Sequence, residues 1–545
     1  MKPKKEKSQK GDMPVKPYQR IYSLLFFSSL LLFLVNYIIQ GQLLFTYFDY
    51  YGIIFKMGWA YWLGYILLLI LVSYHYTNFE HIDSRYVYLS LFLMVTYFIA
   101  TPFLYESLPR FEDTWGHSFL AQEIFGSKRV NIGISIYEQY PGSILFYGLL
   151  FHFIPSYYVM KFFPPLFYYV GILVVYVLFK ELFSFKGTSN AKIAFLIPII
   201  YMFFNWTVED NHISPQFLIL NLYFLFMLLS VKFLYGEKDR KKYFVALTLL
   251  GTVIVLSHPF TPIFLLFILA SVYVLCKELR ARIIPIAVML AAIFVVHSMY
   301  YTTIFDITMD YSKNFIDVLM HGLKFESFAH RLESTIVSRQ VFLSSRIGIT
   351  LMSVILGLAG AVVMRTGKDK ATKKTTANFL LGWSFSLVPF LLFVALAVRG
   401  EFYERFALIS SLPLTALTVY LFNEYEINFS TLLIFLLLLS PFYFIGKYGN
   451  EAFESVSVEK LMANCFSYEF YSRCAEDFRI VDSPLNYDIE NLNKFRFVTS
   501  REEIMAGVVF NNKDIESVSS LIYDIVEEYK LHRIYSTSEA SVFIQ

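Results

Sequence analysis

Acidic and histidine side chains gather in one polar segment that directly follows an apolar run. The segment is PRFEDTWGHSFLAQEIFG, and it contains Glu112, Asp113 and His117. A carboxylate beside a membrane can act as a general base or bind a metal ion. His117 follows Asp113 by four residues, so a helix would carry both on one face. The same residues also suit a solvated acidic helix start, because Asp is favoured at helix caps.

Two shorter polar turns also contain residues that can do chemistry. The turn NWTVEDNHISPQ holds Glu209, Asp210 and His212, and the turn SHPFTP holds His258. Each can equally be an ordinary polar turn between two apolar helices. The glycosylation sequon that begins at Asn205 is expected to lie too close to the membrane to be used.

Basic side chains occur in the segment VRGEFYERF, where Arg399 and Arg405 alternate with Glu401 and Glu404. Arginine binds phosphate through parallel hydrogen bonds, and a lipid phosphate lies at the membrane boundary. Lys161, three residues before the pair Pro164-Pro165, lies just inside the outer boundary of another apolar run. The arginines would also serve as interfacial anchors paired with the glutamates.

The composition shows what must position these residues. The 545 residues are 57% hydrophobic and only 16% charged, whereas soluble proteins carry about 25% charged residues. The sequence therefore predicts an all-α polytopic membrane protein. The formal net charge of +3 gives no basic field for nucleic acid. P-loop, dinucleotide-binding and zincin motifs are absent from the sequence.

The apolar run 21–39 is long enough to cross a hydrocarbon core of about 30 Å, and with the apolar runs that follow it predicts about thirteen transmembrane helices. The runs are 21–39, 53–75, 86–104, 160–183, 191–206, 214–234, 242–257, 261–277, 283–301, 346–364, 377–398, 406–422 and 428–446. The run GSILFYGLLFHFIP is shorter, and we expect it to form a helix on the outer face rather than a span.

The distribution of Lys and Arg predicts the orientation. Basic loops such as YGEKDRKK and RTGKDKATKK alternate with acidic or neutral turns, and basic loops stay in the cytoplasm. Residues 1–20 are therefore expected to be a cytoplasmic basic tail, and 21–446 the transmembrane domain. Its long external loops would be 105–158 and 302–345, and residues 447–545 would lie outside.

The polar C-terminal segment, 447–545, predicts a small extracytoplasmic α/β domain. ESVSSLIYDIVEEYK has the spacing of an amphipathic helix, and HRIYSTSEASVFIQ that of a two-stranded hairpin. Cys465 and Cys474 could pair there or remain two free thiols.

Taken together, these motifs resemble those of the GT-C superfamily of membrane glycosyltransferases. That superfamily includes protein O-mannosyltransferases, oligosaccharyltransferase catalytic subunits and the aminoarabinose transferases of lipid A. Glu112-Asp113 matches the first acidic site, Tyr140-Pro141-Gly142 the Tyr-Pro helix start, Lys180-Glu181 the basic turn, and Glu209-Asp210 the second acidic site. The resemblance covers residues 86–234 best.

The resemblance implies roles for these residues. Asp113 would be the general base, with Glu112 as the alternative. The reaction would transfer a hexosyl or pentosyl group, with inversion, from a polyprenyl- or dolichyl-phosphate-linked donor. Arg405, helped by Arg399 and Lys161, would bind the lipid phosphate. The acceptor or metal side would be formed by Glu209, Asp210, His212, His258 and His117.

Two departures from the family pattern matter. Two helices precede the matching first span, and the Trp-Trp-Asp-Tyr-Gly signature of oligosaccharyltransferases is absent. The second departure argues against transfer of a whole glycan to protein asparagine. The acceptor could be a glycan, a lipid or a protein.

Other interpretations stay open at this point. A divalent cation, Mg or Mn, is compatible with the acidic turns, but no tight ligand cluster requires one. A transporter or flippase for a lipid-linked glycan is the alternative function, and a structural or assembly protein a third. The basic N-terminus fits the plasma membrane of a prokaryote, with an endoplasmic reticulum membrane as the other location.

Overall fold

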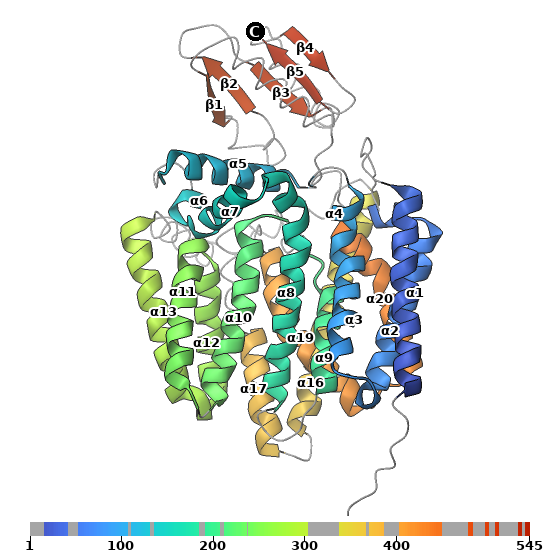
Figure 1. Cartoon of the computed structure of the whole chain (residues 1–545). Helices are drawn as coiled ribbons and strands as arrows, with labels where there is room; N and C mark the ends of the chain where they lie inside the picture. The colour runs from blue at the N-terminus through green and yellow to red at the C-terminus, as the bar shows by residue number, and fades with distance from the viewer. Residues whose placement is uncertain are drawn as a thin grey trace, which may run out of the picture. The chain divides into compact units, whose positions relative to one another are not determined.

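The computed structural model of the chain is a bundle of helices followed by a small sheet (Figure 1). It describes residues 16–41, 53–106, 109, 111–130, 136–184, 191–207, 212–236, 238–302, 337–366, 370–385, 403–448, and five strands between 478 and 544. The chain divides into two compact units. One comprises Met1–Gln42, Asp49–Tyr105 and Phe111–Phe453, and the other comprises Leu43–Phe48, Glu106–Arg110 and Glu454–Gln545.

Every apolar run that predicts a span overlaps a helix in the described part of the chain, and the run 377–398 is described only as far as 385. These helices are α1 (Lys16–Gln40), α2 (Trp59–Thr77), α3 (Arg85–Val95), the π-helical turn η3 (Thr96–Ala100), α4 (Thr101–Tyr105), α8 (Ser156–Ser184), α9 (Ala191–Phe204), α10 (Pro215–Tyr235), α11 (Arg240–Ser257), α12 (Thr261–Leu275), α13 (Arg280–Tyr301), α16 (Val337–Thr366), α17 (Lys370–Phe385), α19 (Tyr403–Glu424) and α20 (Phe429–Tyr448). The short turns η1 (Ile53–Lys56), η2 (Phe79–His81) and η4 (Lys277–Leu279) lie between them.

These helices are those of a membrane protein. In the described part of the chain, eight helices are long and apolar enough to cross a membrane. Large apolar side chains remain exposed along them, as Leu24, Leu31 and Ile38 do on α1. Side chains of this kind are stable against lipid, whereas a soluble bundle would bury them. Several boundaries differ from the sequence-based ones. Helix α1 begins at Lys16, within the predicted tail 1–20, and α16 begins at Val337, within the predicted external loop 302–345. Helix α17 begins earlier than the run at 377, and Lys447 belongs to the last turn of α20.

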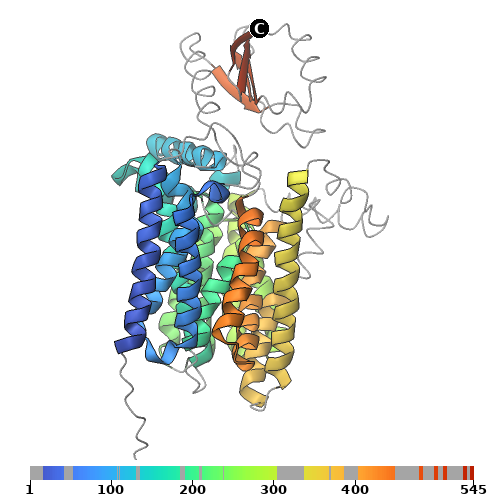
Figure 2. The same ribbon diagram turned by 90° about the vertical axis from the view of Figure 1, so that its right-hand side faces the viewer.

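Three further helices, α5 (Glu112–Ser127), α6 (Ile136–Gln139) and α7 (Gly142–Phe153), lie at one end of the bundle. Helix α5 runs across the ends of the membrane helices (Figures 1 and 2), and it packs against α7. The 12 residues of α7 extend only about 18 Å at 1.5 Å per residue. This helix is therefore too short to be a span, as the sequence predicts. We call this end of the bundle the α5 end.

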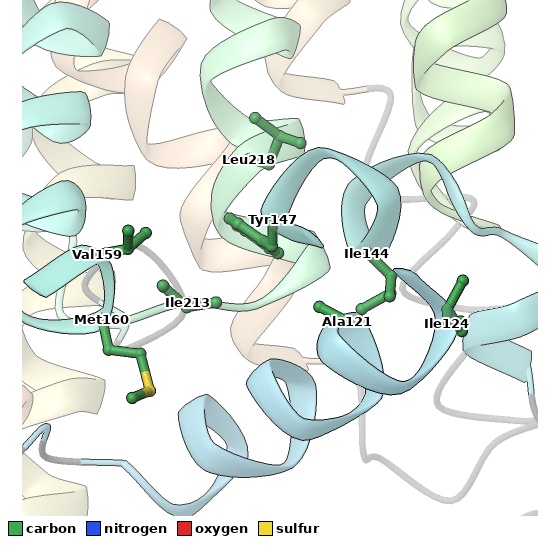
Figure 3. Packing of buried hydrophobic residues seen from close by; sticks show 8 residues of the cluster. All are labelled: Ala121, Ile124, Ile144, Tyr147, Val159, Met160, Ile213 and Leu218. Atoms are coloured by element: carbon green, nitrogen blue, oxygen red, sulfur yellow. The ribbon is translucent and has the colours of Figure 1, made fainter. Parts of the chain in front are cut away.

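A hydrophobic cluster attaches α5 and α7 to the membrane helices (Figure 3). Ala121 and Ile124 of α5 pack on Ile144 and Tyr147 of α7. The other buried members come from α8, from the turn before α10 and from α10, and they are Val159, Met160, Ile213 and Leu218. The cluster determines where the helix carrying Asp113 lies.

The second unit contains a five-stranded antiparallel sheet in the order β1-β2-β3-β5-β4. Its strands are β1 (Phe478–Asp482), β2 (Arg496–Ser500), β3 (Gly507–Asn511), β4 (His532–Ser536) and β5 (Ala540–Ile544). Strands β4 and β5 occupy the segment whose pattern predicts a hairpin, with His532 opposite Ile544. The predicted helix 516–530, Cys465 and Cys474 lie outside the described residues, so an α/β domain stays a prediction.

Candidate functional site

The first acidic site lies at the beginning of α5. Phe111 precedes the helix in an extended conformation, and its carbonyl accepts a hydrogen bond from the Thr114 amide at 3.1 Å. Glu112 and Asp113 are the first two residues of the helix. Carboxylates at this position are favoured by the positive end of the helix dipole. Their side chains lie outside the described part of the structure, so the role of Asp113 stays a prediction.

His117 lies on the buried side of α5, one turn after Asp113. Thr114, Ser118, Ala121 and Ile124 share that buried side, which is the helical spacing expected of a helix packed on one face. The His117 ring meets the Tyr137 ring of α6 edge-on, with the centroids 4.7 Å apart. His117 therefore has an aromatic neighbour from the segment that leads into the Tyr-Pro motif.

The turn between α9 and α10 carries the second acidic site, and its end is well anchored. Ser214 caps α10, because its hydroxyl accepts a hydrogen bond from the Phe217 amide at 3.1 Å, and Pro215 follows at the first helical position. The Tyr147 hydroxyl of α7 donates to the Ser214 carbonyl at 2.7 Å. The helix α7 thus holds the start of α10.

The two acidic segments meet at the α5 end. The rings of Phe111 and His212 lie 4.8 Å apart, and both residues are buried. Phe111 directly precedes Glu112 in the chain, and His212 follows Asp210 by two residues. Glu209 and Asp210 themselves lie outside the described residues. The contact nevertheless brings together the chain segments that carry all four carboxylates.

His258 has a structural partner as well as a place beside a cavity. Its Nδ1 accepts a hydrogen bond from the Thr261 amide at 3.2 Å and lies 3.0 Å from the Thr261 hydroxyl, so the imidazole pairs with the first amide of α12. Gln216, Tyr223 and Leu408 line a small cavity with His258, of about 30 Å³. This cavity joins α10, α12 and α19.

The structure describes the three predicted phosphate-binding residues to different extents. Arg399 lies outside the described residues. Arg405 lies in the first turn of α19, one helical turn before the cavity residue Leu408, and its side chain is not among those described. Lys161 is buried in α8, 4% exposed, and its ammonium donates to the Tyr157 hydroxyl at 3.4 Å.

The Tyr-Pro-Gly motif is where the start of α7 approaches α11 and α13. A Cβ on Gly142 would lie 3.1 Å from the Leu256 carbonyl oxygen and would overlap the Ser257 hydroxyl, so glycine permits this close approach. The Tyr140 ring lies 5.2 Å from the ring of His297 on α13. Burial raises the pKa of the Tyr140 hydroxyl above its ordinary value.

Arg346 and Lys447 are buried at the α5 end and are not among the residues singled out in the sequence. Arg346 of α16 is 3% exposed, and Lys447 of α20 is 1% exposed. Both contact the segment 205–207 that leads into the second acidic turn. The signal available in the sequence is a charged residue at the edge of an apolar run, which membrane proteins keep for a specific reason.

Asn205 is fully buried, and its side-chain oxygen accepts from the Thr207 hydroxyl at 2.8 Å. The sequon at this position therefore has no accessible asparagine. Among the described residues, no group of three or more His, Cys, Asp or Glu side chains could hold a metal ion. The carboxylates that suggest a metal side lie outside that part of the chain.

No model of a protein family and no curated protein matches this chain. Among solved structures, it is similar to the Archaeoglobus fulgidus oligosaccharyltransferase in complex with Zn and sulfate, with 14% identity and a TM-score of 0.46 over 71% of this chain. The chain spans 56% of the length of that protein.

A second structure of the archaeal oligosaccharyltransferase, tethered to an acceptor peptide containing the NVT sequon, gives 13% identity and a TM-score of 0.45. It covers 72% of this chain and 59% of that one. ArnT from Cupriavidus metallidurans, bound to undecaprenyl phosphate, gives 10% identity and a TM-score of 0.38, covering 84% of this chain and 97% of ArnT. Both neighbours are membrane glycosyltransferases of the GT-C superfamily, whose motifs the sequence resembles.

Proposed function

We propose that this chain is a GT-C-type glycosyltransferase that moves a sugar from a polyprenyl-phosphate-linked donor to an acceptor at the α5 end. The observation that carries the proposal is the contact between Phe111 and His212, at 4.8 Å between ring centroids. It joins the segments of the two acidic sites at one end of a membrane bundle. In the proposal, one reaction centre lies between these segments. Asp113 is its base, and Arg405 is its cationic group at the membrane boundary.

The proposal places the α5 end on the outer side of a prokaryotic plasma membrane. The opposite end of the bundle carries basic residues at the helix termini, including Arg85, Arg240, Lys241, Lys277 and Arg280. Such residues are enriched on the cytoplasmic side of membranes. The N-terminus would then be cytoplasmic, and the sheet-containing unit extracytoplasmic.

In the proposed reaction, Asp113 removes the proton from an acceptor hydroxyl as the oxygen attacks the anomeric carbon of the donor. The bond between that carbon and the phosphate oxygen breaks, and its electron pair leaves with the lipid phosphate. Arg405, together with Arg399 and Lys161, stabilises the departing phosphate. A single displacement of this kind inverts the anomeric centre. Glu112 is the alternative base.

The acceptor side would be formed by the second acidic turn and the histidines around it. His212 and His117 lie on the segments that meet there, and His258 borders the small cavity beside α19. Glu209 and Asp210 offer the oxygen ligands that Mg²⁺ or Mn²⁺ prefers. Dialysis against EDTA, followed by return of each ion separately, tests whether transfer uses a cation.

The decisive experiment is sugar transfer by the purified chain with Asp113→Asn. The loss of a general base is expected to lower the transfer rate by about 10²- to 10⁴-fold with the protein still folded in the membrane. Glu123→Gln is the matched control, because Glu123 is exposed on the same helix and should leave the rate unchanged. Full activity of Asp113→Asn with loss in Glu112→Gln would move the base to Glu112.

A transporter or flippase of a lipid-linked glycan is the second candidate, and Lys161 favours it. A buried lysine inside a membrane helix is typical of transport pathways, and α8 also contains Pro164 and Pro165. Vesicles with reconstituted protein separate the two functions. Movement of sugar-lipid across the bilayer without a new glycosidic bond would support transport and reject the enzyme.

A further inference from the structure

The acidic turn between α9 and α10 is anchored at both of its ends. After the turn, which we call the far side, His212 contacts Phe111 and Ser214 accepts a hydrogen bond from Tyr147. Before the turn, which we call the near side, Lys447 of α20 donates from its ammonium to the Thr207 carbonyl at 2.8 Å. Only residues 208–211 separate the two anchors, and these include Glu209 and Asp210.

The near anchor is a compact unit of three elements. The Trp206 indole donates to the Thr350 hydroxyl of α16 at 2.9 Å. The Arg346 guanidinium stacks over the Trp206 ring at 4.5 Å and over the Phe342 ring at 3.9 Å. Its Nε donates to the Gly446 carbonyl of α20 at 2.7 Å. Arg346 therefore ties α16 and α20 to the segment that enters the turn.

The segment 205–207 is itself locked by local hydrogen bonds. The Asn205 side chain accepts from the Thr207 hydroxyl at 2.8 Å and from the Thr207 amide at 3.4 Å. Asn205 and Thr207 are fully buried. These bonds hold the backbone of residues 205–207, from which the chain continues toward Glu209 and Asp210.

Burying an ammonium and a guanidinium carries a large desolvation penalty, which proteins accept mainly where the charge has a specific task. We propose that Lys447 and Arg346 are positioning residues of the acidic turn. They fix the backbone of residues 205–207, through which the chain enters the turn that carries Glu209 and Asp210. The inference rests on the proposed function for its consequence in catalysis, while the anchoring can be measured without it.

A spin label measures the anchoring directly. The label is attached at Asp210→Cys in a chain whose native Cys276, Cys465 and Cys474 are replaced by serine. Lys447→Met removes the bond to Thr207 and is expected to increase the mobility of the label, whereas Lys447→Arg keeps a cationic donor and should not. Lys232→Met is the matched control, because Lys232 pairs with Glu181 at the opposite end of the bundle. Equal mobility in all variants would overturn the proposal.

Sugar transfer gives the second readout, in the otherwise native chain. Because a mispositioned acidic turn affects the reacting geometry more than donor binding, Lys447→Met is expected to lower kcat about tenfold with an unchanged KM for the donor. Lys447→Arg should restore most of kcat. A KM effect alone, or a wild-type kcat for Lys447→Met, would contradict the proposal.

If Lys447→Met fails to fold, Thr350→Val tests the same anchor. It removes the acceptor of the Trp206 indole with little change of shape, and it should increase label mobility by a smaller amount. An unchanged mobility would then overturn the proposal. An inactive wild-type chain with the expected label response would reject the proposed function and retain the anchor, so the two failures are distinguishable.

Discussion

The two ends of the bundle differ in how they hold charged side chains. At the opposite end, ion pairs are open to water: Arg85 and Asp83 lie 2.8 Å apart with side chains 86% and 29% exposed, and Lys242 pairs with Asp239 at 2.8 Å. At the α5 end, Arg346, Lys447 and His212 are buried. Exposed pairs contribute little to stability, whereas buried charges are costly to desolvate.

We interpret the exposed charges as residues that orient the protein in the membrane, and the buried ones as residues that serve the proposed reaction. Exposed basic residues at the opposite end only need to stay on one side of a membrane. Buried charged and imidazole groups at the α5 end need defined partners, and each contacts a particular ring or carbonyl. His75 qualifies the contrast, because it is buried toward the opposite end, where its Nδ1 lies 3.0 Å from the Ser90 hydroxyl. That contact joins α2 to α3.

The largest expected difference between the ends is that between two arginine substitutions. Arg405→Ala at the α5 end removes a proposed phosphate ligand and is expected to lower kcat/KM for the lipid donor by about 10²-fold or more. Arg280→Ala at the opposite end should leave kcat/KM unchanged. Similar losses in both variants, measured by sugar transfer at equal amounts of folded protein, would remove the contrast.

A glycine substitution tests the close approach at the start of α7. Gly142→Ala would place a methyl group against Leu256 and Ser257, and overpacking of this kind destabilises by about 1–3 kcal/mol. Gly348→Ala is the control, because no atom lies within 4 Å of a Cβ built there. Thermal unfolding in detergent should show a lower Tm for the first variant only.

His258 allows capping to be separated from chemistry. His258→Ala removes the acceptor of the Thr261 amide, the first of α12, and should destabilise by about 1 kcal/mol. His258→Asn offers another capping side chain and should recover most of that stability. If His258 also serves the acceptor, the Asn variant should stay poorly active. Recovery of both stability and activity would make His258 a purely structural residue.

The smallest effect is expected for an exposed ion pair. Lys242→Ala removes the partner of Asp239 at the opposite end and should change neither Tm nor the rate of sugar transfer, because water already screens both groups. A clear drop in Tm would show that the opposite end is not simply a solvated surface.

Hydropathy was enough to predict the helices because lipid contact selects apolar side chains along a whole span. It also predicted that α7 is not a span, because the apolar run in this segment of the sequence is short. It could not show that the helix over 85–105 contains the π-helical turn η3. At this turn the Thr101 hydroxyl donates to the Tyr97 carbonyl at 3.0 Å.

The candidate site was only partly predictable. The carboxylates and histidines stand out in the sequence because polar residues are rare between apolar runs. The proximity of Phe111 and His212 does not, because their separation in the chain carries no information about contact. Arg346 and Lys447 were missed because each lies at the edge of an apolar run. At such a position, an exposed basic residue that anchors the helix at the interface and a buried one that contacts another helix have the same sequence pattern.

The sequence by itself determined that this is a membrane protein, which runs become helices, and which polar residues interrupt them. These follow from local composition, because the free energy of transfer into lipid is approximately a sum of contributions from single residues. The tertiary structure decided which polar segments meet, which charges are buried, and which atoms they contact. Such features depend on packing between helices far apart in the chain, as in the clamp that α16 and α20 form around Trp206 and Thr207.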